Sequence, residues 1–158
     1  MHSLIFELVK EQSFKNKSFC EIETEDLSDY HKLIGADYIS KLDKTTDSIE
    51  WLQEYIKAFP YIQFGKDNCG YYIVIDEKAE RQHATNMIRE LHNKIETSIK
   101  AMNKENFNGS LEIYRLKSYI TGFGSFCFIC DGDFYSIQQL LLYLTGKLYI
   151  NNVFDYHY

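Results

Sequence analysis

The amino-acid sequence predicts a single α+β domain with a largely antiparallel sheet of about six to eight strands and with three to four helices. A chain of 158 residues is long enough to bury one hydrophobic core. Segments in which apolar residues alternate are mixed with segments of helical spacing, without a strict strand–helix order. No repeat or low-complexity linker divides the chain, and Pro60 is its one proline. We therefore treat residues 1–158 as one domain.

The first third of the chain is predicted to hold two strands and a helix. Apolar and polar side chains alternate over residues 4–8, which is typical of a strand with one apolar face. The same alternation over residues 20–23 predicts a second strand, paired with the first as a hairpin with a long connection. Helical spacing over residues 27–34 then predicts a helix that ends at Gly35.

The middle of the chain is predicted to form a helix followed by a hairpin. Residues 47–50 resemble a capping box, and the apolar stripe behind them predicts a helix over about 48–58. Pro60 forbids its continuation. Residues 61–64 and 71–75 are short aromatic and β-branched runs around a turn-forming segment, and they predict a hairpin.

The longest apolar stripe predicts a helix over about residues 78–103, because its apolar side chains recur every three or four positions. Residues 111–120 and 123–130 are then predicted to be two strands. The second of these strands is apolar on both faces, which indicates a central strand that is covered on both sides.

The last part of the chain predicts a helix and a closing hairpin. Residues 136–139 match a capping box, and helical spacing continues over 137–144. Apolar runs at 148–150 and 153–156 flank Asn151–Asn152, a pair of residues with the composition of a hairpin turn.

The balance of charge favours a protein partner over nucleic acid. Seventeen Lys and Arg residues against 23 Asp and Glu residues give a formal net charge of −6. Non-specific nucleic-acid binding depends on cations that displace phosphate counterions, and the chain has no run of Lys and Arg. Five acidic residues between Glu21 and Asp29 would suit a basic protein partner, or would form the solvated start of a helix.

The sequence also predicts a location and an oxidation state. No apolar run has the length of a membrane span. The apolar stretch over residues 4–9 is interrupted by Glu7 and is followed by no small-residue cleavage site, so it does not resemble a secretory signal. We therefore expect a cytoplasmic protein with reduced cysteines.

Cys127 and Cys130 have the C-x-x-C spacing of redox and zinc motifs. They fall in a predicted strand, where residues three positions apart point to opposite faces. A zinc site would need two further ligands, and Cys20 and Cys69 have no suitable spacing. We expect buried structural cysteines, and neither a metal nor a cofactor.

Aromatic residues make up 16% of the chain and include 13 tyrosines, a residue type that is enriched at interfaces. On the helix predicted over 48–58, Trp51 and Tyr55 are i,i+4 neighbours beside Glu50 and Glu54. We predict that these four residues form a binding surface, an aromatic anchor in an acidic frame. The alternative is that Trp51 widens the buried face of the helix.

An enzymatic hypothesis uses Asp67, Asp76 and Lys78. An acid in a turn, an acid that ends a strand and a lysine two positions later are similar to the metal-dependent nuclease pattern PD…(D/E)xK, which binds magnesium between its carboxylates. Lys66 stands where that pattern has proline, and eight residues separate the two acids. The alternative interpretation is a solvated hairpin turn followed by the polar start of a helix.

Two functional classes follow from these patterns. We expect a non-enzymatic protein-binding module, comparable in size and charge with immunity proteins, inhibitors or accessory proteins of mobile elements. The alternative is a small metal-dependent nuclease or hydrolase that uses Asp67, Asp76 and Lys78. In both classes, a homodimer could form through an exposed strand edge or an aromatic patch.

Overall fold

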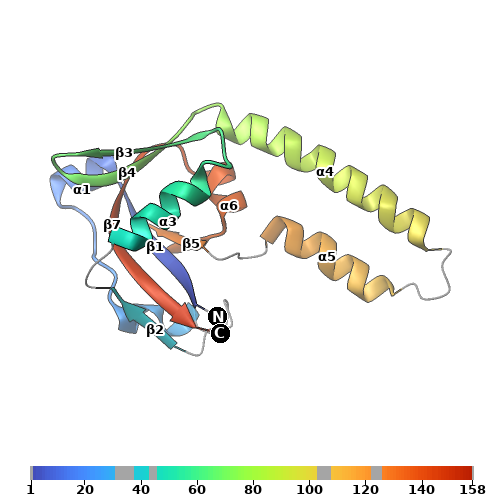
Figure 1. Ribbon diagram of the computed structural model, residues 1–158, viewed down its shortest axis with the longest axis horizontal. Helices are drawn as coiled ribbons and strands as arrows, with labels where there is room; N and C mark the ends of the chain where they lie inside the picture. The colour runs from blue at the N-terminus through green and yellow to red at the C-terminus, as the bar shows by residue number, and fades with distance from the viewer. Residues whose placement is uncertain (1, 31–37, 43–45, 103–107, 122–125, 158) are drawn as a thin grey trace.

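The computed structural model describes residues 2–30, 38–42, 46–102, 108–121 and 126–157. It has the α+β fold that the sequence predicts, with helices around a seven-stranded, mostly antiparallel sheet (Figure 1). Among the described residues, no helix is both long and apolar enough to cross a lipid bilayer.

The elements follow one another along the chain as strands, α-helices and one 3₁₀ helix, η1. Their bounds are β1 (His2–Lys10), α1 (Glu11–Asn16), η1 (Thr24–Tyr30), β2 (Tyr38–Lys41), α3 (Thr46–Ile56), β3 (Ile62–Asp67), β4 (Gly70–Ile75), α4 (Ala79–Ala101), α5 (Gly109–Thr121), β5 (Phe126–Cys130), β6 (Asp133–Tyr135), α6 (Ile137–Tyr143) and β7 (Gly146–His157). The sheet order is β3-β4-β7-β1-β5-β6, and β2 pairs with the far end of β7. β1 and β5 are parallel, and every other pair is antiparallel.

The sheet is covered on both faces because its central strand β1 is apolar on both. Phe6 and Leu8 lie in the larger core, which α3 and α6 cover. Ile5 lies on the opposite face in a smaller core, where it is packed with Leu27 of η1 and Ile39 of β2. Alternate side chains of a strand point to opposite faces, so one strand contributes to both cores.

β5 confirms the prediction of a central strand that is covered on both sides. It lies between β1 and β6, with Phe128 and Cys130 in the larger core and Cys127 and Ile129 in the smaller one. The capping box that begins α6 is also confirmed, because Ser136 and Gln139 exchange the two expected hydrogen bonds.

The predicted closing hairpin is wrong, because residues 146–157 form one continuous strand, β7. The pairing with β1 shifts at Asn151–Asn152: Phe6 is opposite Val153, whereas Leu8 is opposite Ile150. One residue of β1, Glu7, therefore faces two residues of β7, which is a β-bulge. Two consecutive asparagines suggested a turn, but their amides serve to bind a buried carboxylate.

The strand predicted over residues 111–120 is also wrong, because this segment is the helix α5. The β-branched and aromatic residues suggested a strand. In the structure, polar side chains of this segment instead form hydrogen bonds with side chains of α4. Ser98 of α4 donates a hydrogen bond to Glu112 at 2.7 Å, and the Tyr119 hydroxyl donates to Glu90. Tertiary contacts with α4 thus outweigh the weak local preference for a strand.

Two further predictions for the first third of the chain are changed by the structure. Residues 20–23 lie outside every strand, and η1 follows them where the start of an α-helix was predicted. The rest of that predicted helix, residues 31–34, and its end at Gly35 lie outside the described residues. The hairpin of β3 and β4 and the long helix α4 are confirmed.

The helices α4 and α5 form an arm that extends from the rest of the molecule (Figure 1). We call residues 79–121 the arm and the remainder of the chain the body. Ala79, His83 and Met87 are buried at the base of the arm, where α4 packs against α6. Farther along α4, the side chains are half-buried or exposed. The arm is therefore anchored at one end.

Candidate functional site

The orientation of α3 exposes the only tryptophan of the chain. Ile49, Leu52 and Ile56 are buried on the side of the helix that faces the sheet. Trp51 is offset from this stripe, and 60% of its surface is exposed. Trp51 therefore does not widen the buried face of α3, and its indole ring is available to a partner.

Tyr55 belongs to the core and not to the same exposed surface. Its ring is half-buried and lies 4.5 Å, between centroids, from the ring of Phe126 on β5. Burial raises the pKa of its hydroxyl, and the neighbouring Cys127 contributes to the same shift. Trp51 and Tyr55 are one turn apart, but the helix presents them to different surroundings.

Three exposed carboxylates lie on α3, and two of them are neighbours of Trp51. Asp47 is four positions before Trp51 and Glu54 is three positions after it, so both share its side of the helix. Glu50 is one position before Trp51 and is rotated from it by about 100°. Lys57 donates a hydrogen bond to Glu54 at 2.5 Å. The sequence analysis considered Asp47 only as part of a capping box, although its i,i+4 spacing to Trp51 could have placed it on this surface.

Asp67, Asp76 and Lys78 are not brought together by the fold. Asp67 is opposite Gly70 at the turn between β3 and β4, and Asp76 follows the other end of β4. Six residues of extended chain separate Gly70 from Asp76, a span of about 20 Å. The Asp76 carboxylate instead accepts a hydrogen bond from the backbone N–H of Lys78 at 2.7 Å.

Asp67 takes part in a different cluster. Its carboxylate accepts hydrogen bonds from the Lys147 ammonium at 2.5 Å and from the Tyr149 hydroxyl at 2.7 Å. The hydrogen bond from Lys147 is the main reason why the pKa of Asp67 lies well below its usual range. The Lys147 ammonium also lies 3.9 Å from the centre of the Tyr72 ring. The cluster holds the β3–β4 turn against β7.

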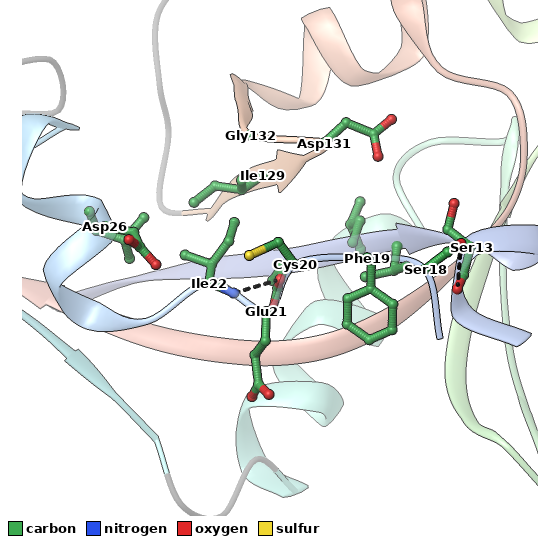
Figure 2. Close-up of a pocket in the computed structure, with 14 residues that line it drawn as sticks. Ser13, Ser18, Phe19, Cys20, Glu21, Ile22, Asp26, Ile129, Asp131 and Gly132 are labelled. Atoms are coloured by element: carbon green, nitrogen blue, oxygen red, sulfur yellow. Dashed lines mark hydrogen bonds between the residues drawn. The ribbon is translucent and has the colours of Figure 1, made fainter. Parts of the chain in front are cut away.

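A cavity of about 480 Å³ lies between β1, the segment over residues 18–27 and the turn between β5 and β6 (Figure 2). Its walls include Glu7, Cys20, Asp26 and Asp131, together with apolar side chains such as Ile129. Asp131 is already paired with Lys10, whose ammonium lies 2.5 Å from its carboxylate. The sequence analysis missed this cavity, because its walls come from three distant parts of the chain.

Glu7 lies in the wall of this cavity, and only 2% of its surface is exposed. One oxygen accepts a hydrogen bond from the backbone N–H of Ile22 at 3.1 Å. The other accepts from the side-chain amides of Asn151 at 2.9 Å and Asn152 at 2.7 Å. Burial raises the pKa of Glu7, although these three hydrogen bonds oppose the shift.

The Glu7 carboxylate connects three parts of the body. It lies at the β-bulge of the central pair β1–β7, and it holds the segment before η1 through Ile22. A buried carboxylate needs such partners, because an unpaired charge in the interior is strongly destabilising. Among the described residues, no three His, Cys, Asp or Glu side chains lie close enough together to bind a metal ion.

The two cysteines of the C-x-x-C motif lie on opposite faces of the sheet, as their spacing predicts. Both Cys127 and Cys130 are buried and free. Burial raises the pKa of each thiol to about 11. At neutral pH both are therefore predominantly protonated, and a thiol is a weaker nucleophile than a thiolate.

The exposed apolar side chains of the described residues are concentrated on the arm. Ten large apolar or aromatic side chains are exposed, and three of them, Tyr38, Trp51 and Tyr143, lie on the body. The seven others lie on the arm, with exposed fractions of 40–69%: Ile88, Ile95, Ile99, Met102, Leu111, Ile113 and Tyr114. Such a concentration marks an interaction surface more often than scattered apolar residues do.

Comparison with known proteins identifies no relative: no family model, no curated protein and no solved structure matches the chain.

Proposed function

We propose that the chain is a protein-binding module that recognises a basic partner through the acidic surface of α3 around Trp51. The exposure of Trp51 carries this proposal. The indole is the largest apolar side chain, and 60% of its surface faces solvent although its helix has a well-buried opposite side. Tryptophan is among the residues most enriched at interface hot spots.

The charge of the body supports a basic partner. The arm has seven basic and five acidic residues, a net charge of +2, so the −6 of the whole chain leaves −8 on the body. Asp47 and Glu54 place part of this charge beside Trp51. Complementary charge would speed association with a basic partner, while the indole would supply the apolar contact.

The proposal includes a cytoplasmic location. All four cysteines are free, and Cys20 and Cys69 are exposed thiols. A reducing compartment is the one in which such thiols persist without forming disulfides.

The acidic frame can be tested without knowledge of the partner, because Trp51 is the only tryptophan and its fluorescence reports on one place. We expect caesium ions to quench this fluorescence more strongly than iodide ions, since negative charge attracts the cation. The double variant Asp47→Asn, Glu54→Gln should bring the two quenching constants together. Equal quenching by both ions in the wild type would contradict a negatively charged surface around Trp51.

The binding proposal itself is tested by affinity capture from cells that express the chain, with quantification of each captured protein. We expect at least one basic protein to be captured by the wild type and to be lost with Trp51→Ala. Tyr143→Ala is the matched control, because Tyr143 is an exposed aromatic residue on α6, outside this surface. Equal recovery of every protein by all three baits would contradict the proposal.

A further inference from the structure

One side of the arm has an apolar stripe that no other described element covers. Its members recur along α4 at intervals of three, four, four and three residues, so they lie on one side of the helix. They are Ile88, Leu91, Ile95, Ile99 and Met102. Leu91 is half-buried and the other four are exposed. In water, a stripe of this length has a strong tendency to be buried against a partner.

The second helix extends this apolar side. α4 and α5 are held together by the bond from Ser98 to Glu112 and the bond from Tyr119 to Glu90. When both helices are viewed along one direction, successive residues of α4 rotate one way and successive residues of antiparallel α5 rotate the other way. Ser98 of α4 faces Glu112 of α5. Ile99 and Ile113, each one position later, are therefore rotated to the same side of the hairpin, so Ile113 lies on the side of the α4 stripe. The other side of the hairpin has a polar groove lined by residues such as Asn93 and Arg115.

An apolar hollow lies at the base of the stripe, where the arm meets the body. It has a volume of about 180 Å³, and its walls are Ala84, Met87, Ile88 and Leu91 of α4 and Leu142 of α6. The stripe and the hollow share Ile88 and Leu91, so they form one continuous apolar surface. We call this surface, together with Ile113, the arm face.

We propose that the arm face binds the arm face of a second copy of this chain, with the two α4 helices antiparallel and Ile95 on the two-fold axis. The spacing of the stripe is the main argument. Read from either end, its intervals are the same, three, four, four and three. A two-fold axis at Ile95 therefore places Leu91 of one copy beside Ile99 of the other, and Ile88 beside Met102.

The hollow gives a reason for this register. When Met102 of one copy lies beside Ile88 of the other, it also lies beside the hollow, because Ile88 is one of the hollow's walls. Methionine is flexible and fills irregular apolar spaces well. Each copy has one hollow and one Met102, so both hollows are filled by the same two-fold operation.

The area of the arm face is sufficient for a specific dimer. Residues 84–102, which run along α4 to its C-cap residue, extend over about 30 Å, and two packed helices are about 20 Å wide. The two copies would together bury about 1,200 Å², the lower end of the range for specific interfaces. The result is a four-helix bundle in which every neighbouring pair of helices is antiparallel, a well-known arrangement of helical hairpins.

The charge distribution favours the antiparallel orientation. In a parallel pair, the two bodies of net charge −8 would lie side by side. With the axis at Ile95, each base at Ala79 is about 24 Å from the centre, so the bodies are separated by several Debye lengths. The arm of each copy, which has a net charge of +2, lies with its tip directed towards the acidic body of the other copy.

This dimer is independent of the proposed function, because the arm face and the surface around Trp51 are on different helices. The experiment measures the molar mass by sedimentation from about 1 to 100 µM. We expect a dimer in the wild type, and monomers for Ile95→Lys and for Ile95→Glu, because each places two like charges at the axis. Mixing the two variants should restore a dimer, because the charges are then opposite. Ile95 is exposed, so both variants should keep the circular dichroism spectrum of the folded chain.

Tyr114→Lys is the matched control, because Tyr114 is exposed and is rotated by about 200° around α5 from Glu112, which faces α4; it therefore lies outside the arm face. It should leave the mass unchanged. A monomeric wild type at every concentration would overturn the proposal, and so would a dimer that Ile95→Lys leaves intact. A dimer that is lost with Ile95→Lys but is not restored by mixing would overturn the two-fold axis at Ile95. None of these results depends on whether Trp51 binds a partner.

Discussion

The body and the arm use apolar side chains in opposite ways. In the body, β1 and β5 place apolar residues on both faces of the sheet, and helices, β2 and η1 cover them almost completely. In the arm, α4 has an equally regular apolar stripe, but the side chains beyond Met87 are half-buried or exposed. Periodicity therefore shows which side of a helix is apolar, and it does not show what covers that side.

The largest expected difference between the two regions is in the stability lost when an apolar side chain is shortened. Phe128→Ala should lower the free energy of unfolding by about 3–5 kcal/mol, because Phe128 is fully buried and a cavity would remain. Ile99→Ala on the arm should change it by less than about 0.5 kcal/mol. Urea unfolding at a protein concentration where the chain is monomeric measures both. Similar losses for the two variants would contradict the view that apolar side chains are buried in the body and exposed on the arm.

Removal of a buried carboxylate of the body should cause the next largest loss of stability. Glu7→Ala removes the acceptor for Ile22, Asn151 and Asn152, and we expect a loss of about 2–4 kcal/mol at pH 7. Glu50→Ala, which removes an exposed carboxylate, should cost less than about 0.5 kcal/mol.

The effect of pH on the Glu7 variant follows from the direction of its pKa shift. The folded-state pKa of Glu7 is raised by burial, so protonated Glu7 stabilises the folded chain more than ionised Glu7 does. The wild type therefore gains stability from Glu7 as the pH falls through this raised pKa, and Glu7→Ala lacks the gain. The difference between the two proteins should be larger at pH 5 than at pH 7. A smaller difference at pH 5 than at pH 7 would contradict a raised pKa of Glu7 in the folded state.

The smallest change in stability is expected from the protonation of His83, where the arm joins the body. Burial lowers the pKa of His83, whose ring is near Tyr61. A lowered folded-state pKa means that the stability contributed by neutral His83 is lost as the pH falls below about 6.5. Hydrogen exchange at the base of α4, corrected for the intrinsic rate, should accelerate relative to β1 between pH 7.5 and pH 5.5. His83→Leu should remove this acceleration, and an equal acceleration in the variant would contradict the role of His83.

Local sequence patterns predicted the parts of the fold that local chemistry determines. The helix that begins after Ser136, the strand β5 and the hairpin of β3 and β4 follow from capping, from apolar runs and from turn residues. The errors at residues 111–120 and 146–157 arose where distant contacts decide the structure. α5 depends on α4, and the asparagines of β7 depend on Glu7, which is 144 residues away from the first of them.

The candidate site was predictable to the extent that one helix defines it. The helical spacing of α3 puts Trp51 outside the stripe of Ile49, Leu52 and Ile56, and the structure shows that Trp51 is exposed. The position of Tyr55 depended on Phe126, a contact between distant segments that spacing does not reveal. The same holds for Asp67, whose partners Lys147 and Tyr149 lie on β7.

The position of β7 has a consequence for the order in which this chain can fold during synthesis. β7 pairs with β1, β2 and β4, and it begins at Gly146, whereas β4 ends at Ile75. A ribosome that has made the first 145 residues has therefore made no strand able to join β1 to β4. Until the last strand emerges, nascent chains expose the apolar surfaces of both cores, and chaperones that bind such surfaces would have their longest opportunity during this interval.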